Sequence, residues 1–298
     1  MPRAHIYQIL NHYTPREDLD PGFGVLDNSA NERPDWFEYW PMRRFLLNET
    51  LEDDAYYGFL SPKFHRKTNL TAAAVKEFIE PADPGVDVFL FSPSIQNSAY
   101  FWNVFEHGDS EHPGLAAVAA RLLERIDPAT RLDDLVSDSR NTVHSNYFVA
   151  KPGFWRAWLA ANERLFAIAE SSDDPLGAAL RAPTPYRGAR NVQMKIFVME
   201  RIATWLLTRD ATFKACARDP FAARSRIYKL PLAIVCDALK IAYATQRRTQ
   251  YREVFHLVAS LRRCLNLEVR LGAMLGIGRV RPSLRALESY WRSRAPSP

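Results

Sequence analysis

The chain has 298 residues, enough for one large domain or two smaller ones with a substantial core. Apolar residues make up 47% and charged residues 24%, as in a globular protein. The sequence has no apolar run of about eighteen residues, so no transmembrane helix is expected. The net charge of +5 is unevenly divided. Residues 221–298 contain fifteen Lys and Arg but four Asp and Glu, a net charge of +11, which leaves −6 for the first 220 residues.

Strand and helix patterns alternate in the first part of the chain. Buried strands are predicted at 5–10, 55–60, 86–93 and 145–152. Helices are predicted at 36–47, 71–80, 97–108, 114–126, 154–170 and 191–207. This alternation predicts an α/β fold whose mostly parallel sheet is flanked by helices.

Three local features qualify these elements. Pro41 is expected to kink or divide the helix at 36–47, and Thr71 is expected to cap the helix that follows it. The segment 171–190 reads as a loop, because it holds three prolines and two glycines. From residue 228 onward the pattern is helical only, so we expect residues 1–220 to form the α/β domain and 221–298 a basic helical extension.

A cluster of cationic residues follows the strand predicted at 55–60. Lys63, His65, Arg66 and Lys67 come directly after Ser61-Pro62, with Phe64 inside the cluster. Ligands of open α/β sheets bind at the carboxyl ends of the strands, and Lys and Arg there suit a diphosphate. The alternative is a solvated basic loop, because runs of charge are usually exposed.

A second group of candidates surrounds the first strand pattern. Asn28, Asn31 and Arg33 can hydrogen-bond to a base or a ribose, and we extend this nucleotide-binding prediction to Asp87 at the start of the third strand. The alternative is structural, with Asp35 capping a helix over an aromatic core.

The last candidates lie around the fourth strand and in the helix at 191–207. Asp138, His144 and Asn146 precede or begin that strand. Glu200 stands among Phe197, Val198, Met199 and Ile202, where burial would raise its pKa and suit it to act as a base. The alternative is an ion pair with Arg201 at the edge of a buried stripe.

The metal-ligand patterns of the sequence are weak. The strand at 86–93 runs into Ser92-Pro93-Ser94 instead of an Asp-x-Asp pair, so no metal ligand is assigned, although a divalent cation stays open as a cofactor. Residues 106–112 contain two His and three acidic residues without an established ligand spacing, which favours a solvated loop. The three cysteines, Cys216, Cys236 and Cys264, are expected to be reduced thiols, and the N-terminus lacks a signal-peptide pattern.

The order of these segments resembles a family of capsular-polysaccharide and lipopolysaccharide glycosyltransferases with a nucleotide-diphospho-sugar transferase fold of the GT-A type. The resemblance covers roughly residues 5–207. It rests on NSANERPDWFEYW, then YYGFLSPKFHRKT, VDVFLF, SNYFVAKPGFWRAW and VMERIATWLL, in this order. The sequence departs from the family where SPKFHRKT replaces a run of the type HYRRY, and in its long basic C-terminal part.

The resemblance implies a GT-A-like, Rossmann-type fold, a nucleotide-sugar donor and a saccharide or lipid-linked acceptor. It implies that Lys63, Arg66 and Lys67 face the diphosphate and that Asn146, with His144 beside it, lines the acceptor side. Glu200 would be the catalytic carboxylate, with Asp138 as the second choice. We therefore expect a cytoplasmic glycosyltransferase of surface polysaccharide synthesis, peripheral to the inner membrane.

The basic C-terminal part also supports a different class of function. A non-enzymatic protein could use the +11 charge of residues 221–298 to bind an anionic membrane or nucleic acid. No nucleic-acid-binding module is recognisable, so the membrane is the favoured partner of this region and nucleic acid the less favoured one. Tyr290 and Trp291 add aromatic residues that suit a lipid interface.

Overall fold

A computed structural model describes residues 3–93, 95–186, 192–221 and 230–274, without the side chains of residues 230 and 262–274. The chain divides into two compact units, one of residues 1–93 and 102–220 and one of residues 94–101 and 221–298. Among the described helices, none combines the length and the apolar character needed to cross a membrane.

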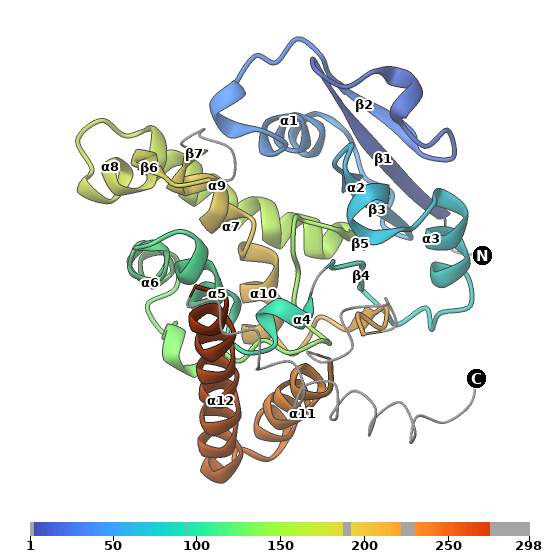
Figure 1. The fold of residues 1–298 in the computed structure, drawn as a ribbon. Coiled ribbons are helices and arrows are strands. Elements are labelled where there is room, and N and C mark those ends of the chain that lie inside the picture. Colours follow the sequence, from blue (N-terminus) through green and yellow to red (C-terminus); the bar gives the residue numbers. More distant parts are fainter. Residues whose placement is uncertain (1–2, 94, 187–191, 222–229, 275–298) are drawn as a thin grey trace. The chain divides into compact units, whose positions relative to one another are not determined.

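The first unit is built on a six-stranded sheet with the strand order β2-β1-β3-β5-β4-β8 (Figure 1). Its strands are β1 (Arg3–Asn11), β2 (Gly24–Asn28), β3 (Ala55–Leu60), β4 (Val88–Leu90), β5 (Phe148–Ala150) and β8 (Ala215–Ala217). Five strands run in one direction, and β5 runs antiparallel to its neighbours β3 and β4. The predicted α/β class with a mostly parallel sheet is confirmed.

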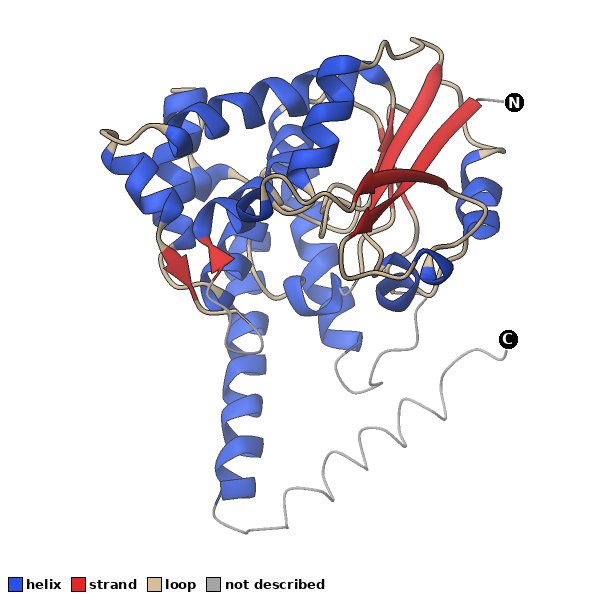
Figure 2. Ribbon diagram, turned by 90° about the horizontal axis from the view of Figure 1, so that it is seen from above, coloured by secondary structure: helices blue, strands red, loops and turns tan. Residues whose placement is uncertain are grey.

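Side chains alternate between the two faces of the sheet, because successive residues of a strand point in opposite directions. In β3, Tyr57 and Phe59 belong to one hydrophobic cluster, and Tyr56 and Leu60 belong to another on the opposite face. Helices cover both faces (Figure 2). The larger cluster packs under α1 (Tyr39–Asn48), α5 (Val104–Glu111), α6 (Leu115–Ile126), α7 (Pro152–Glu170), α8 (Pro175–Arg181), α9 (Met194–Met199) and α10 (Ile202–Arg209); the smaller lies under α2 (Phe64–Thr68) and α3 (Ala72–Ile79).

Short elements connect these layers. The 3-10 helices are η1 (Arg16–Asp18), η2 (Pro34–Trp36) and η3 (Leu132–Asp134), and β6 (Pro183–Thr184) pairs with β7 (Val192–Gln193) in a separate antiparallel ribbon. The strands β2 and β8 were not predicted. Both pair through a single neighbour, and β2 lies in a stretch whose composition is typical of turns.

Of two predictions about helix ends and breaks, the cap at Thr71 is confirmed and the kink at Pro41 is wrong. Thr71 caps α3 as expected, since its side chain accepts a hydrogen bond from the N–H of Ala74 at 3.3 Å. Pro41 neither kinks nor divides α1, because it is the third residue of that helix, where no intrahelical donor is required.

Two other segments correct the sequence-based prediction. The segment 171–190 contains helix α8, capped by Asp174, whose carboxylate accepts from the N–H of Leu176 at 2.9 Å. The predicted helix at 191–207 is divided into β7, α9 and α10. The division falls at Glu200 and Arg201, where the Arg201 side chain donates to the carbonyl of Phe197 in the preceding turn.

The second unit is helical, with α4 (Ile95–Ser98), α11 (Leu230–Gln246) and α12 (Thr249–Met274) among its described residues. Helices α11 and α12 pack against each other. The buried Lys240 on α11 donates to the carbonyl of Phe101 at 3.1 Å. The following residues of the basic extension lie outside the described side chains: Arg224, Arg226, Lys229, Arg262, Arg263, Arg270, Arg279, Arg281, Arg285, Tyr290, Trp291, Arg292 and Arg294.

Candidate functional site

The candidate site lies at the carboxyl edge of β3 and β4 in the first unit. Because β5 runs antiparallel between them, the residues that precede β5 meet the residues that follow β3 and β4. The cationic segment after β3 and the segment around His144 therefore share one edge of the sheet, as the prediction for a ligand site requires.

The cationic segment forms the short helix α2 and is not a loop. The side chain of Phe64 is fully buried, with its ring centroid 5.0 Å from that of Tyr147 and 5.9 Å from that of Phe23. Asn69 ends the helix in a left-handed conformation, with φ 57°. The buried ring fixes the helix on the sheet, while Lys63, Arg66 and Lys67 are exposed.

Two hydrogen bonds join the exit of β3 to the entry of β5. The ammonium of Lys67 donates to Oγ of Ser145 at 2.8 Å and lies 5.4 Å from the ring centroid of Tyr147. The hydroxyls of Ser61 and Tyr147 are 2.6 Å apart in a buried position. These contacts hold one cation of α2 against the segment that precedes β5.

The backbone before β5 has an unusual conformation. Ser145 and Asn146 are consecutive residues with φ 59° and 53°, in the left-handed region that residues other than glycine rarely adopt. Such conformations persist where the surrounding structure imposes them, often at functional sites. Here Ser92 holds the backbone just before Ser145 in place. Its hydroxyl donates to the carbonyl of Thr142 at 2.7 Å and accepts from the N–H of His144 at 3.0 Å.

Asn146 and Glu200 lie on the other side of this segment. Asn146 is 5% exposed, and its amide nitrogen lies 3.4 Å from the sulfur of Met199, the residue before Glu200. Among the described residues, no donor reaches the side-chain amide oxygen Oδ1 of Asn146. Asn146 therefore connects the segment before β5 to the end of α9.

Glu200 is a titratable group of this edge whose surroundings shift its pKa. Burial raises the pKa of Glu200, the charges of Arg201 and Lys67 oppose that rise, and the charge of Glu38 adds to it. Burial likewise raises the pKa of Tyr147, on which Glu38, Glu200 and Arg66 also act. Lys67, Tyr147 and Glu200 are thus close enough to interact electrostatically. Glu200 is half-buried.

The guanidinium of Arg201 binds backbone carbonyls and does not form the ion pair with Glu200 that was considered as the structural alternative. It donates to the carbonyls of Val104, at 2.9 Å, and Phe197, at 2.5 Å. Burial lowers the pKa of Arg201. Arg201 therefore fixes the break between α9 and α10 through the backbone.

Four of the predicted site residues are placed elsewhere or serve other contacts. Asp87 precedes β4, at the opposite edge of the sheet, where its carboxylate interacts with Lys151 at 3.5 Å. Asp138 is fully buried and accepts from the guanidinium of Arg140 at 2.8 Å and from the N–H of Arg140 at 2.9 Å, so it closes a turn. Asn31 is in a left-handed turn after β2.

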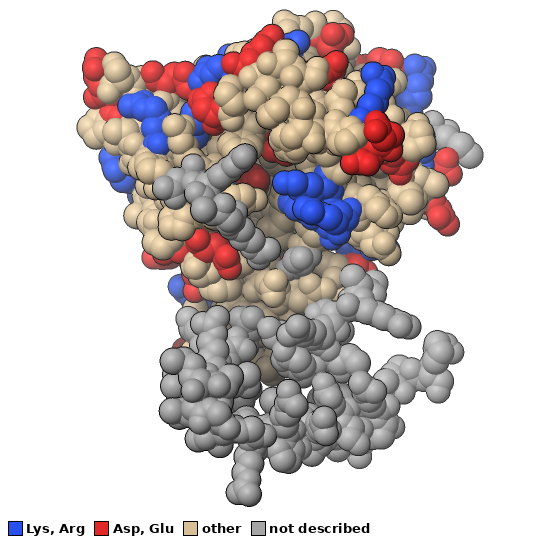
Figure 3. All heavy atoms as spheres, turned by 45° about the horizontal axis from the view of Figure 1, so that its top comes forward, with Lys and Arg blue, Asp and Glu red and all other residues tan. Residues whose placement is uncertain are grey.

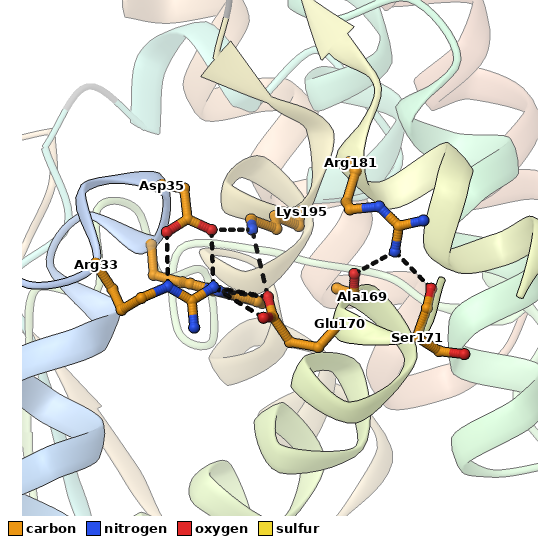
Figure 4. A network of polar contacts seen from close by, with 8 residues as sticks. Arg33, Asp35, Ala169, Glu170, Ser171, Arg181 and Lys195 are labelled. Carbon is orange, nitrogen blue, oxygen red and sulfur yellow. Dashed lines mark hydrogen bonds and ion pairs between the residues drawn. The ribbon is translucent and has the colours of Figure 1, made fainter. Parts of the chain in front are cut away.

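Arg33, the fourth of these residues, belongs to an ion-pair network (Figure 4). Its guanidinium contacts Asp35 at 2.9 Å and Glu170 at 2.8 Å. The ammonium of Lys195, at the start of α9, lies 2.7 Å from Asp35 and 4.0 Å from the ring centroid of Trp36. The helix-capping role considered for Asp35 is not found, since neither η2 nor α1 begins with a side-chain cap. Asp35 instead belongs to a network that joins η2 to α7 and α9.

The remaining predicted residues lie at the carboxyl edge without joining Lys67 and Glu200. Asn28 ends β2 and donates to the side chain of Asn11, at the end of β1, at 3.4 Å. The ring of His144 lies 5.6 Å from that of His107 on α5. Figure 3 shows a group of Lys and Arg side chains near the middle of the displayed face, beside a recess with acidic side chains.

The segment 106–112, expected to be a loop, lies mostly within helix α5. Two of its three acidic residues bind backbone groups, since Glu106 accepts from the N–H of Trp102 and Asp109 from the N–H of Ala116. Across the described residues, no group of three or more His, Cys, Asp and Glu side chains is arranged to hold a metal ion.

Sequence reasoning missed Ser61, Ser145 and Tyr147. These residues could have been placed at the site only if the direction of β5 had been known. The apolar pattern of β5 does not indicate that direction. No protein-family model, no curated protein and no solved structure matches this chain.

Proposed function

We propose that the protein is a glycosyltransferase that moves a sugar from a nucleotide-diphospho-sugar to a saccharide or lipid-linked saccharide acceptor in surface polysaccharide synthesis. The observation that supports this proposal best is the meeting of Lys67, the segment before β5 and Glu200 at one edge of the sheet. The GT-A-like character of the fold and the cytoplasmic, membrane-peripheral location remain part of the proposal.

The proposed chemistry assigns the cations to the leaving group. When the bond between the sugar and the diphosphate breaks, the electron pair stays with the diphosphate. Lys63 directly precedes α2, and Arg66 and Lys67 lie on it; all three are exposed, and their charges would stabilise the negative charge that develops. A short helix anchored by the buried Phe64 would hold them in place before the donor binds.

The proposed base is Glu200. As the acceptor hydroxyl attacks the sugar, its proton would pass to the Glu200 carboxylate, and the new glycosidic bond would form. A raised pKa makes a carboxylate a stronger proton acceptor, which suits a base. If the enzyme retains configuration, Glu200 positions the acceptor and the leaving diphosphate takes the proton.

The test combines donor binding with turnover. Thermal shifts with UDP-, GDP-, CMP- and dTDP-sugars, with and without Mg²⁺, identify the nucleotide. Glu200→Gln should keep the shift and lose transfer, whereas Arg66→Ala and Lys67→Ala should weaken donor binding by about tenfold each. Arg121→Ala, an exposed cation on α6, is the matched control and should change neither property.

Two results would contradict the proposal. Normal turnover by Glu200→Gln would remove Glu200 from the mechanism. If no nucleotide-sugar stabilises the protein and only polyanions or anionic vesicles do, the chain is better explained as a binding protein that does not transfer sugar.

A further inference from the structure

The second unit carries an exposed apolar stripe on α12. Val254, Leu257 and Leu261 are 45%, 61% and 52% exposed. Their spacing of three and four residues places them on one face of the helix. Phe255 and Ala259 are 1% and 2% exposed, so a different face of α12 is buried. The helix therefore has more apolar surface than packing within the described chain uses.

Helix α11, which packs against α12 (Figure 1), also has exposed apolar side chains. Ile234 and Val235 are 45% and 43% exposed. Of the nine large hydrophobic side chains that are exposed in the described part of the chain, five belong to these two helices. A concentration of this kind marks an interaction surface, whereas single exposed hydrophobic residues are ordinary.

Positive charge accompanies the stripe. Arg247 and Arg248 are exposed in the turn between α11 and α12, and the half-buried Arg252 and the exposed Glu253 directly precede Val254. Residues 221–298 carry a net charge of +11. An apolar helix face with cations nearby fits the interface of an anionic bilayer, because the apolar side chains enter the acyl boundary while the cations meet headgroups.

We propose that the stripe of Val254, Leu257 and Leu261 binds the surface of an anionic lipid membrane, with Arg247 and Arg248 at the headgroups. Nucleic acid fits the stripe less well, because phosphates attract the arginines but offer nothing to exposed leucine and valine, and bases stack on aromatic rings. The proposal does not depend on sugar transfer, and its test contains no donor or acceptor.

The test is flotation of the full chain with lipid vesicles. The wild-type protein should bind vesicles that contain phosphatidylglycerol and should bind pure phosphatidylcholine vesicles much less. Leu257→Asp/Leu261→Asp should lower the partition coefficient by about tenfold or more. Leu257→Gln/Leu261→Gln, which adds no charge, should also lower it. Leu47→Asp, at a position 51% exposed on α1, is the matched control and should bind as the wild type does.

A second pair of variants tests the charge. Arg247→Gln/Arg248→Gln should weaken binding to phosphatidylglycerol vesicles and reduce its dependence on salt. Circular dichroism confirms that each variant is folded. The proposal is overturned if both leucine pairs bind as the wild type does, if pure phosphatidylcholine binds equally well, or if the protein binds an RNA oligomer and no vesicle.

Discussion

The ammonium nitrogen of Lys195 lies 2.7 Å from a carboxylate oxygen of Asp35, and 1% of the Lys195 side chain is exposed. This contact joins two distant segments, because Asp35 lies in η2, three residues before Glu38, and Lys195 lies in α9, which ends next to Glu200. Glu38 is one of the charges that act on Glu200. The ion pair therefore links the segment that carries Glu38 to the helix that ends beside Glu200.

Replacing Lys195 by methionine should destabilise the protein. The change leaves Asp35 and Glu170 without the ammonium, although Arg33 still contacts both and their side chains are 34% and 35% exposed. We expect a loss of about 1–3 kcal/mol in the free energy of unfolding by urea. Arg156→Ala breaks an exposed pair with Asp53 and should cost about 0.5 kcal/mol or less. Equal losses in the two variants would contradict this prediction.

The same network should make the free energy of unfolding depend on pH in the acidic range. Burial alone would raise the pKa of Glu170, but hydrogen bonds from Arg33 and Trp36 lower it below its ordinary value, and hydrogen bonds from Arg33 and Lys195 do the same for Asp35. As the pH falls below about 5, the unfolded chain binds protons before the folded one, so stability falls.

Glu170→Gln removes one of these groups and should flatten the fall in the urea midpoint between about pH 5 and pH 3. Glu77→Gln, at an exposed position on α3, should keep the wild-type slope. A wild-type slope in Glu170→Gln would show that the network does not couple to protonation.

The buried hydroxyl pair of Ser61 and Tyr147 should behave as a coupled unit. Either Ser61→Ala or Tyr147→Phe leaves the other hydroxyl without its partner at 2.6 Å, and each should cost about 1–3 kcal/mol of unfolding free energy. The double variant leaves no unpaired hydroxyl and should cost less than the sum of the single variants. Additive losses would mean that the two hydroxyls do not depend on each other.

Gly108 should resist replacement by alanine, although alanine normally stabilises a helix interior. A Cβ at this position of α5 would lie 2.5 Å from Nε of Arg201, whose guanidinium is held by backbone carbonyls. We expect Gly108→Ala to destabilise the protein by about 1–3 kcal/mol. Gly153→Ala in α7 meets no atom within 4 Å and should be neutral or stabilising by up to about 1 kcal/mol. If both variants unfold alike, the close approach of Arg201 is not a constraint.

If Glu200 is the base, its raised pKa sets the acid limb of the pH dependence of kcat. The rate should fall as Glu200 becomes protonated, at a higher pH than for a glutamate with an ordinary pKa. Because the charge of Lys67 lowers the pKa of Glu200, Lys67→Met should move this limb to higher pH at saturating donor. Arg121→Met should leave the limb in place. If the acid limb of Lys67→Met stays where it is in the wild type, the charge of Lys67 does not act on the pKa of Glu200.

Much of the fold follows from local patterns in the sequence. Residues 55–60 form β3 with the predicted limits, and α6 and α7 occupy their predicted ranges within two residues. These elements carry strong apolar periodicity, which needs no information about distant contacts. Two-sided burial explains the continuous apolar runs of β3 and β4, whose residues are all buried.

The elements that were missed depend on long-range contacts. Strand β2 pairs in register with β1 and has little apolar pattern, and β8 is a three-residue strand on the far side of β4. The break at Glu200 and Arg201 lies inside an unbroken apolar pattern, and it is fixed by hydrogen bonds from Arg201 to Phe197 and to Val104 on another element.

The sequence by itself determined the cationic cluster at 63–67, the apolar surroundings of Glu200 and the basic C-terminal part. Only the tertiary structure decided that β5 runs antiparallel between β3 and β4. That direction places Ser145, which precedes β5, against Lys67, which follows β3. Asp87 precedes β4, which runs parallel to β3, so it lies at the opposite edge of the sheet. Strand direction is set by packing and chain connectivity, which composition and periodicity do not record.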